Sequence, residues 1–105
     1  LKKYKVTLIK TSVGTDGYLN LRSILIKARK LGYSRIFLES GIKLISSFFK
    51  EKLVNDFQLF ISKNKLSRIG KINVDNDLKI FLKNKTKSHQ KINLLGDKLL
   101  YYKIK

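Results

Sequence analysis

The sequence predicts an α/β fold whose elements follow the order βαβαβ, with a β-rich segment closing the chain. Three observations predict this order. Residues 4–10 alternate between apolar and polar side chains, as in a half-buried strand. An apolar helical face follows over residues 20–31, and a short apolar run, Ile36-Phe37-Leu38, comes soon after it. A strand, a helix and a second strand in succession predict a parallel pair joined by a right-handed crossover.

The first predicted helix, over residues 20–31, has a signal at each end. Asn20 is a residue type that accepts hydrogen bonds from the free amides of a first helical turn. Gly32 follows the last apolar position and can take the left-handed conformation that ends many helices. Before the helix, residues 11–19 contain Gly14, Asp16 and Gly17, which predict a hairpin turn or a loop.

The second half of the chain begins with a predicted helix over residues 42–52, which Gly41 opens. Its apolar face consists of Leu44, Ile45, Phe48 and Phe49. Further along we expect a strand at 56–62, a loop at 63–74, a short helix or strand at 75–82, an exposed turn at 83–89, and a last strand or terminal hairpin from 92–95 and 99–104 around Gly96-Asp97.

Length and composition narrow the class of protein. A chain of 105 residues with 43% hydrophobic residues is expected to form one domain with a modest core. The absence of cysteine excludes disulfides and thiolate metal sites, and His89 as the single histidine predicts no zinc site. No apolar run approaches the roughly 20 residues that span a bilayer, so we expect a cytoplasmic protein. Because the chain begins with Leu1 inside a plausible strand, we expect it to be a piece of a longer protein.

The net charge of +17 raises the alternative of a basic nucleic-acid-binding α/β module. The charge is spread along the chain, since residues 1–62 carry a net charge of +8 and residues 63–105 one of +9. Lysine outnumbers arginine by 20 to 4, whereas nucleic-acid modules use arginine at base edges and aromatic residues for stacking. We therefore favour a lysine-rich solvated surface, and nucleic acid remains the alternative partner.

One stretch has the pattern of a binding site. Glu39 ends the predicted strand at 36–38, and Gly41 opens the next helix. Ligands of open α/β sheets gather at the carboxyl ends of strands, and the free amides of a helix start favour a phosphate. Ser46 and Ser47 would add hydroxyl groups one turn further on. The alternative is structural: Glu39 only caps this helix or pairs with Lys43, and Gly41 only shapes the turn.

These residues also carry a resemblance to a known family. The stretch reads Leu31-Gly32-Tyr33-Ser34-Arg35-Ile36-Phe37-Leu38-Glu39-Ser40-Gly41, then Leu44 and Phe48, then Leu53-Val54-Asn55-Asp56 and the strand from Phe57 to Ile61. It resembles the C-terminal reductase domain of bacterial bifunctional riboflavin-biosynthesis deaminase-reductases. The pattern of that family is a strand ending in Glu-Gly-Gly, a helix with Leu and Phe, Leu-Val-Asp-Glu and a strand. Gly96-Asp97 resembles its closing Gly-Asp segment, so the resemblance covers residues 4–105 and is specific over 31–62.

The resemblance implies a three-layer, dihydrofolate-reductase-like fold, of which residues 1–105 are a single partial domain, the C-terminal half. It implies an NADPH-dependent reduction of the ribosyl group of 5-amino-6-(5-phosphoribosylamino)uracil to a ribityl group. Glu39 matches the substrate-contacting glutamate. The cofactor-binding segment matches Gly41, Ile42, Lys43, Leu44, Ile45, Ser46 and Ser47. No catalytic side chain and no metal ligand is assigned.

The partners that the resemblance implies are the phosphoribosylaminopyrimidine substrate, the N-terminal half and deaminase domain of the parent chain, and a second copy in a homodimer. The 105-residue chain alone is expected to have little or no activity. The sequence departs from the family pattern at Ser40, which replaces a glycine, and at Asn55-Asp56, which replace Asp-Glu. Thr15-Asp16-Gly17 directly precedes the helix at 20–31 and does not replace the Ser-Leu-Asp-Gly strand of the missing half.

Overall fold

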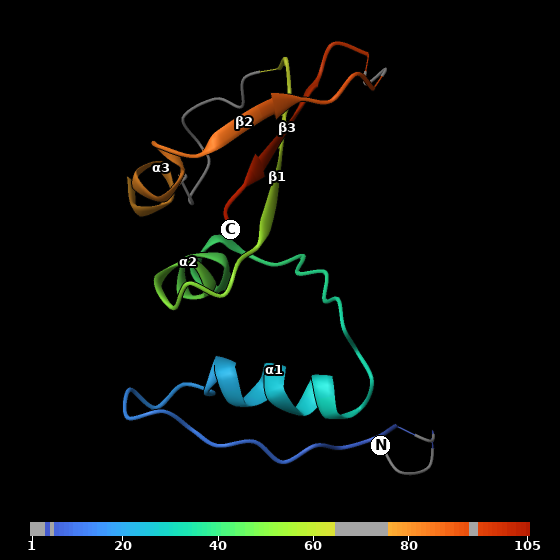
Figure 1. The fold of residues 1–105 in the computed structure, drawn as a ribbon, viewed down its shortest axis with the longest axis vertical. Coiled ribbons are helices and arrows are strands. Elements are labelled where there is room, and N and C mark those ends of the chain that lie inside the picture. The colour runs from blue at the N-terminus through green and yellow to red at the C-terminus, as the bar shows by residue number, and fades with distance from the viewer. Residues whose placement is uncertain (1–3, 5, 65–75, 93–94) are drawn as a thin grey trace. The chain divides into compact units, whose positions relative to one another are not determined.

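The computed structural model describes residues 4, 6–64, 76–92 and 95–105 (Figure 1). The chain divides into two compact units, Leu1–Glu39 and Ser40–Lys105. The described residues form three helices and one sheet of three antiparallel strands, so the predicted α/β class is confirmed at this level.

The first unit contains a tight turn and the helix α1, Leu21–Lys30. A bridge between Val13 and Leu19 closes the turn, as the hairpin interpretation of the glycine-rich loop predicts. The Asn20 side chain accepts a hydrogen bond of 2.8 Å from the Ser23 amide, and Gly32 has a φ of 95°. Both predicted helix signals are therefore confirmed, because each acts through the local backbone alone.

The two strands predicted in this unit are wrong. Residues 6–12 and 33–39 are described, and they form neither helix nor strand. Ile36 is 52% exposed and Phe37 is 83% exposed, so the short apolar run is not buried. Apolar periodicity specifies which side chains share a face, but a strand also needs a hydrogen-bonding neighbour. The described part of the first unit supplies none, so the parallel pair and its crossover do not form.

The second unit begins with α2, Ile42–Lys50, and β1, Asp56–Ile61, which confirm the helix predicted at 42–52 and the strand predicted at 56–62. The ambiguous segment at 75–82 is a helix, α3, Asn76–Leu82. The predicted exposed turn at 83–89 is wrong over its last part, because Thr86–His89 form the strand β2. The loop predicted at 63–74 lies almost wholly outside the described residues.

The last strand, β3, spans Lys98–Lys103 and lies in the centre of the sheet, whose order is β1-β3-β2. It runs antiparallel to both neighbours, so β1 and β2 run parallel to each other. The partner of β3 in the terminal hairpin is β2 and not the predicted segment 92–95. Within that segment Ile92 lies outside any strand, and residues 93–94 are not among the described residues. All four residues of β2 are polar and exposed, so this strand has no apolar alternation from which it could have been predicted.

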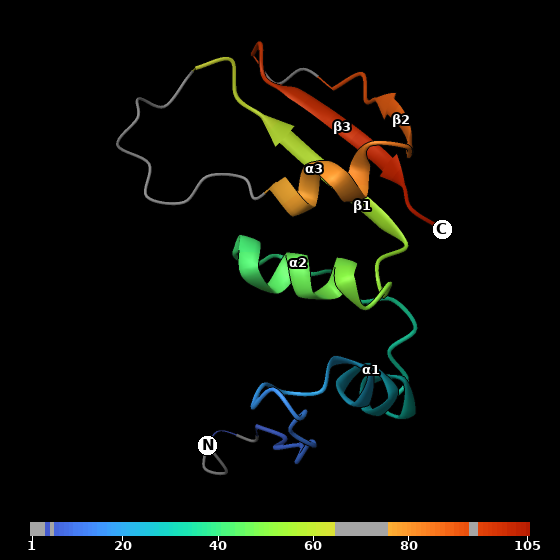
Figure 2. The ribbon, with the colours of Figure 1, turned by 90° about the vertical axis from the view of Figure 1, so that its left-hand side faces the viewer.

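The core of the second unit lies between the sheet and the two helices α2 and α3, which lie on the same side of it (Figure 2). The Phe49 ring of α2 meets the Phe57 ring of β1 edge-on with centroids 5.3 Å apart, and it stacks on Phe81 of α3 at 5.4 Å. Phe57 faces Tyr102 across the strand pair, with centroids 6.2 Å apart. Leu78, Leu99, Leu100 and Tyr102 are buried with Phe49.

The turn before β3 is tied to the end of β1. Asp97 Oδ1 accepts hydrogen bonds from the Lys63 amide at 3.0 Å and from the Ser62 hydroxyl at 3.3 Å. Gly96 has a φ of 100°, and a Cβ added there would lie 2.7 Å from Lys63 Cδ. The positive φ favours glycine at this position, whereas the exposed Lys63 side chain can move away from an added Cβ.

Candidate functional site

The predicted binding residues begin where α2 begins. Gly41 is the N-cap, with a φ of −68°, and no side chain caps this helix. A Cβ added to Gly41 would meet no atom within 4 Å. The first amides of an α-helix have no carbonyl partner within the helix and carry the positive end of its dipole. The backbone here is thus open to a ligand, and the fold itself does not require glycine.

The remaining residues of the predicted segment point in several directions around α2. Leu44 is 42% exposed, although it was predicted to lie on the apolar face. Ser47 donates its hydroxyl hydrogen to the Lys43 carbonyl at 3.1 Å, so this donor is used inside the helix. Ser46 is buried, with 6% of its surface exposed, and its hydroxyl oxygen has no hydrogen-bond partner. Ser46 is therefore the one hydroxyl of the segment that the fold leaves unsatisfied.

Glu39 does not end a strand, because residues 33–39 form no strand. Its side chain is exposed, and it belongs to the first unit, whereas Gly41 belongs to the second. The predicted strand end that would have brought a carboxylate and the helix amides together is therefore absent. A role of Glu39 in substrate binding rests on the resemblance.

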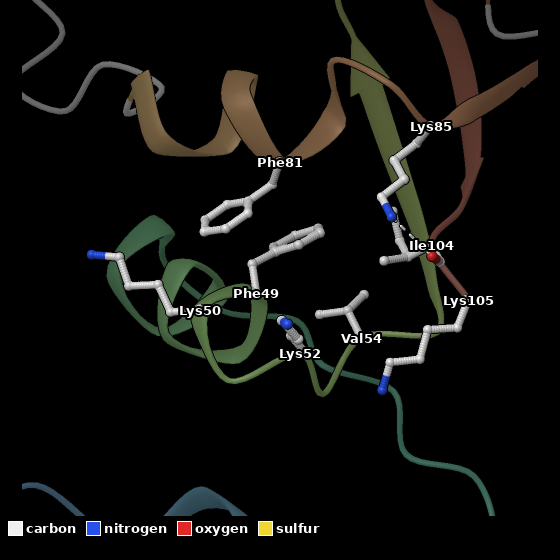
Figure 3. Close-up of a pocket in the computed structure, with 8 residues that line it drawn as sticks. All are labelled: Phe49, Lys50, Lys52, Val54, Phe81, Lys85, Ile104 and Lys105. Carbon is white, nitrogen blue, oxygen red and sulfur yellow. Dashed lines mark hydrogen bonds between the residues drawn. The ribbon is translucent and has the colours of Figure 1, made fainter.

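Two hollows of the second unit were not predicted from the sequence. One is a cavity of about 270 Å³ beside the C-terminal end of α2, with Phe49 and Phe81 in its wall (Figure 3). The other is a wider groove along β1 and α3, which Phe60 and Leu78 help to line. No residue from 39 to 47 lines either hollow. The residues of the cavity come from three separate stretches of the sequence, 49–54, 81–85 and 104–105, so no local spacing pattern predicts it.

No protein-family model, no curated protein and no solved structure matches this chain. In the part of the chain that the structure describes, no helix has the length and apolar character needed to cross a membrane.

A polar cluster lies across strands β1 and β3. Asp56 accepts a hydrogen bond from the Tyr101 hydroxyl, and the Lys103 ammonium lies 2.9 Å from Asp56 Oδ1. The hydrogen bond to Asp56 holds the pKa of Tyr101 above its ordinary value of 10.0 and that of Lys103 above 10.5. None of the three lines the cavity or the groove. These interactions join β1 and β3 through side chains on neighbouring strands.

The other titratable candidates have no site around them. His89 is exposed on β2, opposite Leu100 of β3. Asp16 accepts a hydrogen bond from the Tyr18 amide at 3.1 Å, so it is a turn residue, as predicted.

Proposed function

We propose that this chain is the C-terminal part of an NADPH-dependent reductase of riboflavin biosynthesis. The reaction is the reduction of the ribosyl group of 5-amino-6-(5-phosphoribosylamino)uracil to a ribityl group. The single observation that carries the proposal is the start of α2, where Gly41 leaves open backbone next to amides that no side chain caps.

Two further features support the proposal. The resemblance calls for a helix, then Leu-Val-Asp-Glu, then a strand; here α2 is followed by Leu53-Val54-Asn55-Asp56 and β1. It also calls for Gly-Asp before the final strand, and Gly96-Asp97 directly precedes β3. The finer fold, a three-layer dihydrofolate-reductase-like partial domain, belongs to the same proposal.

In this proposal the amides of Ile42, Lys43 and Leu44 hold a phosphate of the cofactor, since a helix start favours a bound anion. The bound cofactor supplies the hydride. Gly41 lets the backbone approach the ligand without a side chain between them. The exposed carboxylate of Glu39 is assigned to the substrate by the resemblance. The N-terminal half of the parent domain is needed to complete the substrate site.

The test is a titration of the full 105-residue chain with NADPH, in which binding is monitored through the amide chemical shifts of the protein in NMR spectra. The expected result is weak, saturable binding that shifts the amides of residues 41–47. Gly41→Ala is expected to fold normally, because its φ is negative and its surroundings are open, and to bind NADPH about tenfold more weakly.

The Gly41→Ala variant is matched in net charge to the natural chain, so general attraction of NADPH to the lysines is the same in both. Equal affinity of the two proteins, or shifts spread over surface lysines, would refute the cofactor segment. The gene upstream of Leu1 offers a separate test, in which a zinc deaminase and a Ser-Leu-Asp-Gly strand are expected.

A second candidate is a nucleic-acid-binding module, which one observation favours. Tyr33 and Phe37 are 63% and 83% exposed, and Arg35 lies between them in the sequence. Exposed aromatic rings next to a cation can stack on unpaired bases. This function predicts binding to single-stranded DNA, with a binding constant whose logarithm falls steeply as the logarithm of the salt concentration rises. It also predicts that Phe37→Ala binds this DNA more weakly. Binding of DNA that Phe37→Ala leaves unchanged would exclude it.

A further inference from the structure

The cavity at the C-terminal end of α2 has an apolar floor that is only half covered. Phe49 is 5% exposed and stacks on Phe81 with an angle of 13° between the rings. Val54, Phe81 and Ile104 are half-buried, so apolar surface remains for an occupant to cover. The volume of about 270 Å³ is just below the roughly 300–1,000 Å³ of common small-molecule pockets. It suits an apolar group of about one ring.

The rim of the cavity is cationic. Lys50, Lys52, Lys85 and Lys105 make up half of its eight lining residues, and none of the eight is acidic. Lysine makes up only 20 of the 105 residues of the chain and two of the ten residues around the wider groove. The rim is therefore richer in lysine than the general composition explains.

The individual lysines are not equivalent. The Lys85 ammonium donates a hydrogen bond of 3.2 Å to the Ile104 carbonyl, which holds it beside the cavity. An ammonium has three donors, so this bond leaves two for a ligand. Figure 3 shows the Lys50 side chain extending away from Val54 and Ile104. Lys52, Lys85 and Lys105 are accordingly the cations that we assign to a ligand.

Lys52 is held in a conformation that suits glycine. Its φ is 56°, in the left-handed region, where a side chain costs conformational energy. The helix α1 ends with the same hydrogen-bonding pattern, and there the equivalent residue is Gly32. A lysine near a helix C-terminus also complements the helix dipole, but this does not explain a cationic rim to which Lys85 and Lys105 contribute from other elements. Backbone strain of this kind is often found at binding sites.

Charge decides what kind of occupant fits. A second copy of the chain carries a net charge of +17. A second copy would therefore be repelled by the lysine rim. We propose that the cavity binds a small organic anion, with an apolar body about one ring in size on the Phe81 face and an anionic group among Lys52, Lys85 and Lys105. This cavity is distinct from the proposed cofactor segment, which lies at the opposite end of α2.

The experiment uses 4-phenylbutyrate as the probe and the neutral 4-phenylbutanol as its control, each titrated into the full chain and followed by amide chemical shifts. The expected result is saturable binding of the carboxylate with shifts at Val54, Phe81 and Ile104. The alcohol, which lacks the charge, is expected to bind about tenfold more weakly. Equal affinity for the two compounds, or no saturable shift at these residues, would overturn the proposal.

Variants separate the rim from the general positive charge. Lys85→Gln is expected to weaken 4-phenylbutyrate binding about tenfold, and Lys83→Gln, which removes the same charge beside the wider groove, less than twofold. Lys52→Gly relieves the left-handed conformation of Lys52 and is expected to stay folded, which urea unfolding of the same variant checks; it is expected to weaken binding about tenfold. Val54→Phe fills the cavity and is expected to abolish binding. Similar losses in Lys83→Gln and Lys85→Gln, or full binding in Val54→Phe, would contradict the site.

Discussion

Lys52 occupies the position in α2 that Gly32 occupies in α1. Each is the first residue beyond the helix cap, and each donates its amide hydrogen, over 2.9 Å, to the carbonyl three residues earlier. The residue after each donates to the carbonyl five residues earlier, as in a Schellman motif. Their φ values are 56° and 95°. The same backbone geometry thus ends both helices, with glycine, which favours a positive φ, in α1 and with lysine, which does not, in α2.

Exchanging these residue types is expected to change stability in opposite directions. Lys52→Gly should raise the free energy of unfolding by about 0.5–1 kcal/mol, because glycine takes a positive φ at little steric cost. Gly32→Ala should lower it by about 1 kcal/mol; a Cβ there meets no atom within 4 Å, so the cost is conformational. Urea unfolding followed by circular dichroism measures both. A loss of stability in Lys52→Gly would show that its side chain is needed for the fold.

Two other glycines provide a second contrast. Gly96→Ala is expected to lower the free energy of unfolding by about 1–2 kcal/mol, since its φ of 100° is costly for a residue with a Cβ, while the exposed Lys63 side chain can move aside. Gly41→Ala is expected to change it by less than about 0.5 kcal/mol, because the φ is −68° and the space is open. Thermal unfolding of both variants checks this. Equal losses would mean that the start of α2 is also under steric constraint.

Substitution of Ser46 tests whether its hydroxyl group, which has no hydrogen-bond partner, lowers the free energy of unfolding. Its oxygen is buried without a partner, which costs free energy. Ser46→Ala removes that oxygen and is expected to raise the free energy of unfolding by about 0.5–1 kcal/mol, helped by the higher helix propensity of alanine. Ser47→Ala, on the exposed side of the same helix, is the control and should change it less. A lower stability of Ser46→Ala would indicate a partner for this hydroxyl.

The cluster of Asp56, Tyr101 and Lys103 predicts how stability depends on pH. Asp56 raises the pKa of both partners, so the folded state holds their protons more tightly than the unfolded state. This contribution is complete below the ordinary values of 10.0 and 10.5, and it is lost as the pH rises through the raised pKa values of the folded state. The difference in unfolding free energy between the natural chain and Asp56→Asn is therefore expected to shrink from pH 9 to pH 12.

Glu39→Gln is the control for that measurement, since it removes one exposed carboxylate and alters the net charge equally. Its difference from the natural chain should stay nearly constant over the same range. Deprotonation of the many lysines affects all three proteins alike, so the comparison isolates the cluster. A constant difference for Asp56→Asn would show that its hydrogen bonds do not persist in solution.

The sequence by itself determined the local elements of this protein. The bounds of α1 follow from Asn20 and Gly32, and β1 follows from the alternation that places Phe57 and Leu59 on one face. These signals act within a few residues, through a cap, a left-handed glycine or a two-residue period. The start of α2 at Gly41 was predictable for the same reason, whereas the proposed cofactor segment comes from the resemblance.

Only the tertiary structure decided which apolar runs become strands and where side chains distant in sequence meet. The runs at 6–10 and 36–38 have strand-like sequences and no partner strand among the described residues, whereas the polar β2 is a strand because β3 pairs with it. Hydrogen-bonded pairing is a property of two segments together, which no single segment encodes. The cavity at the end of α2 likewise depends on tertiary contacts, because the residues that line it lie as far apart in the sequence as Phe49 and Lys105.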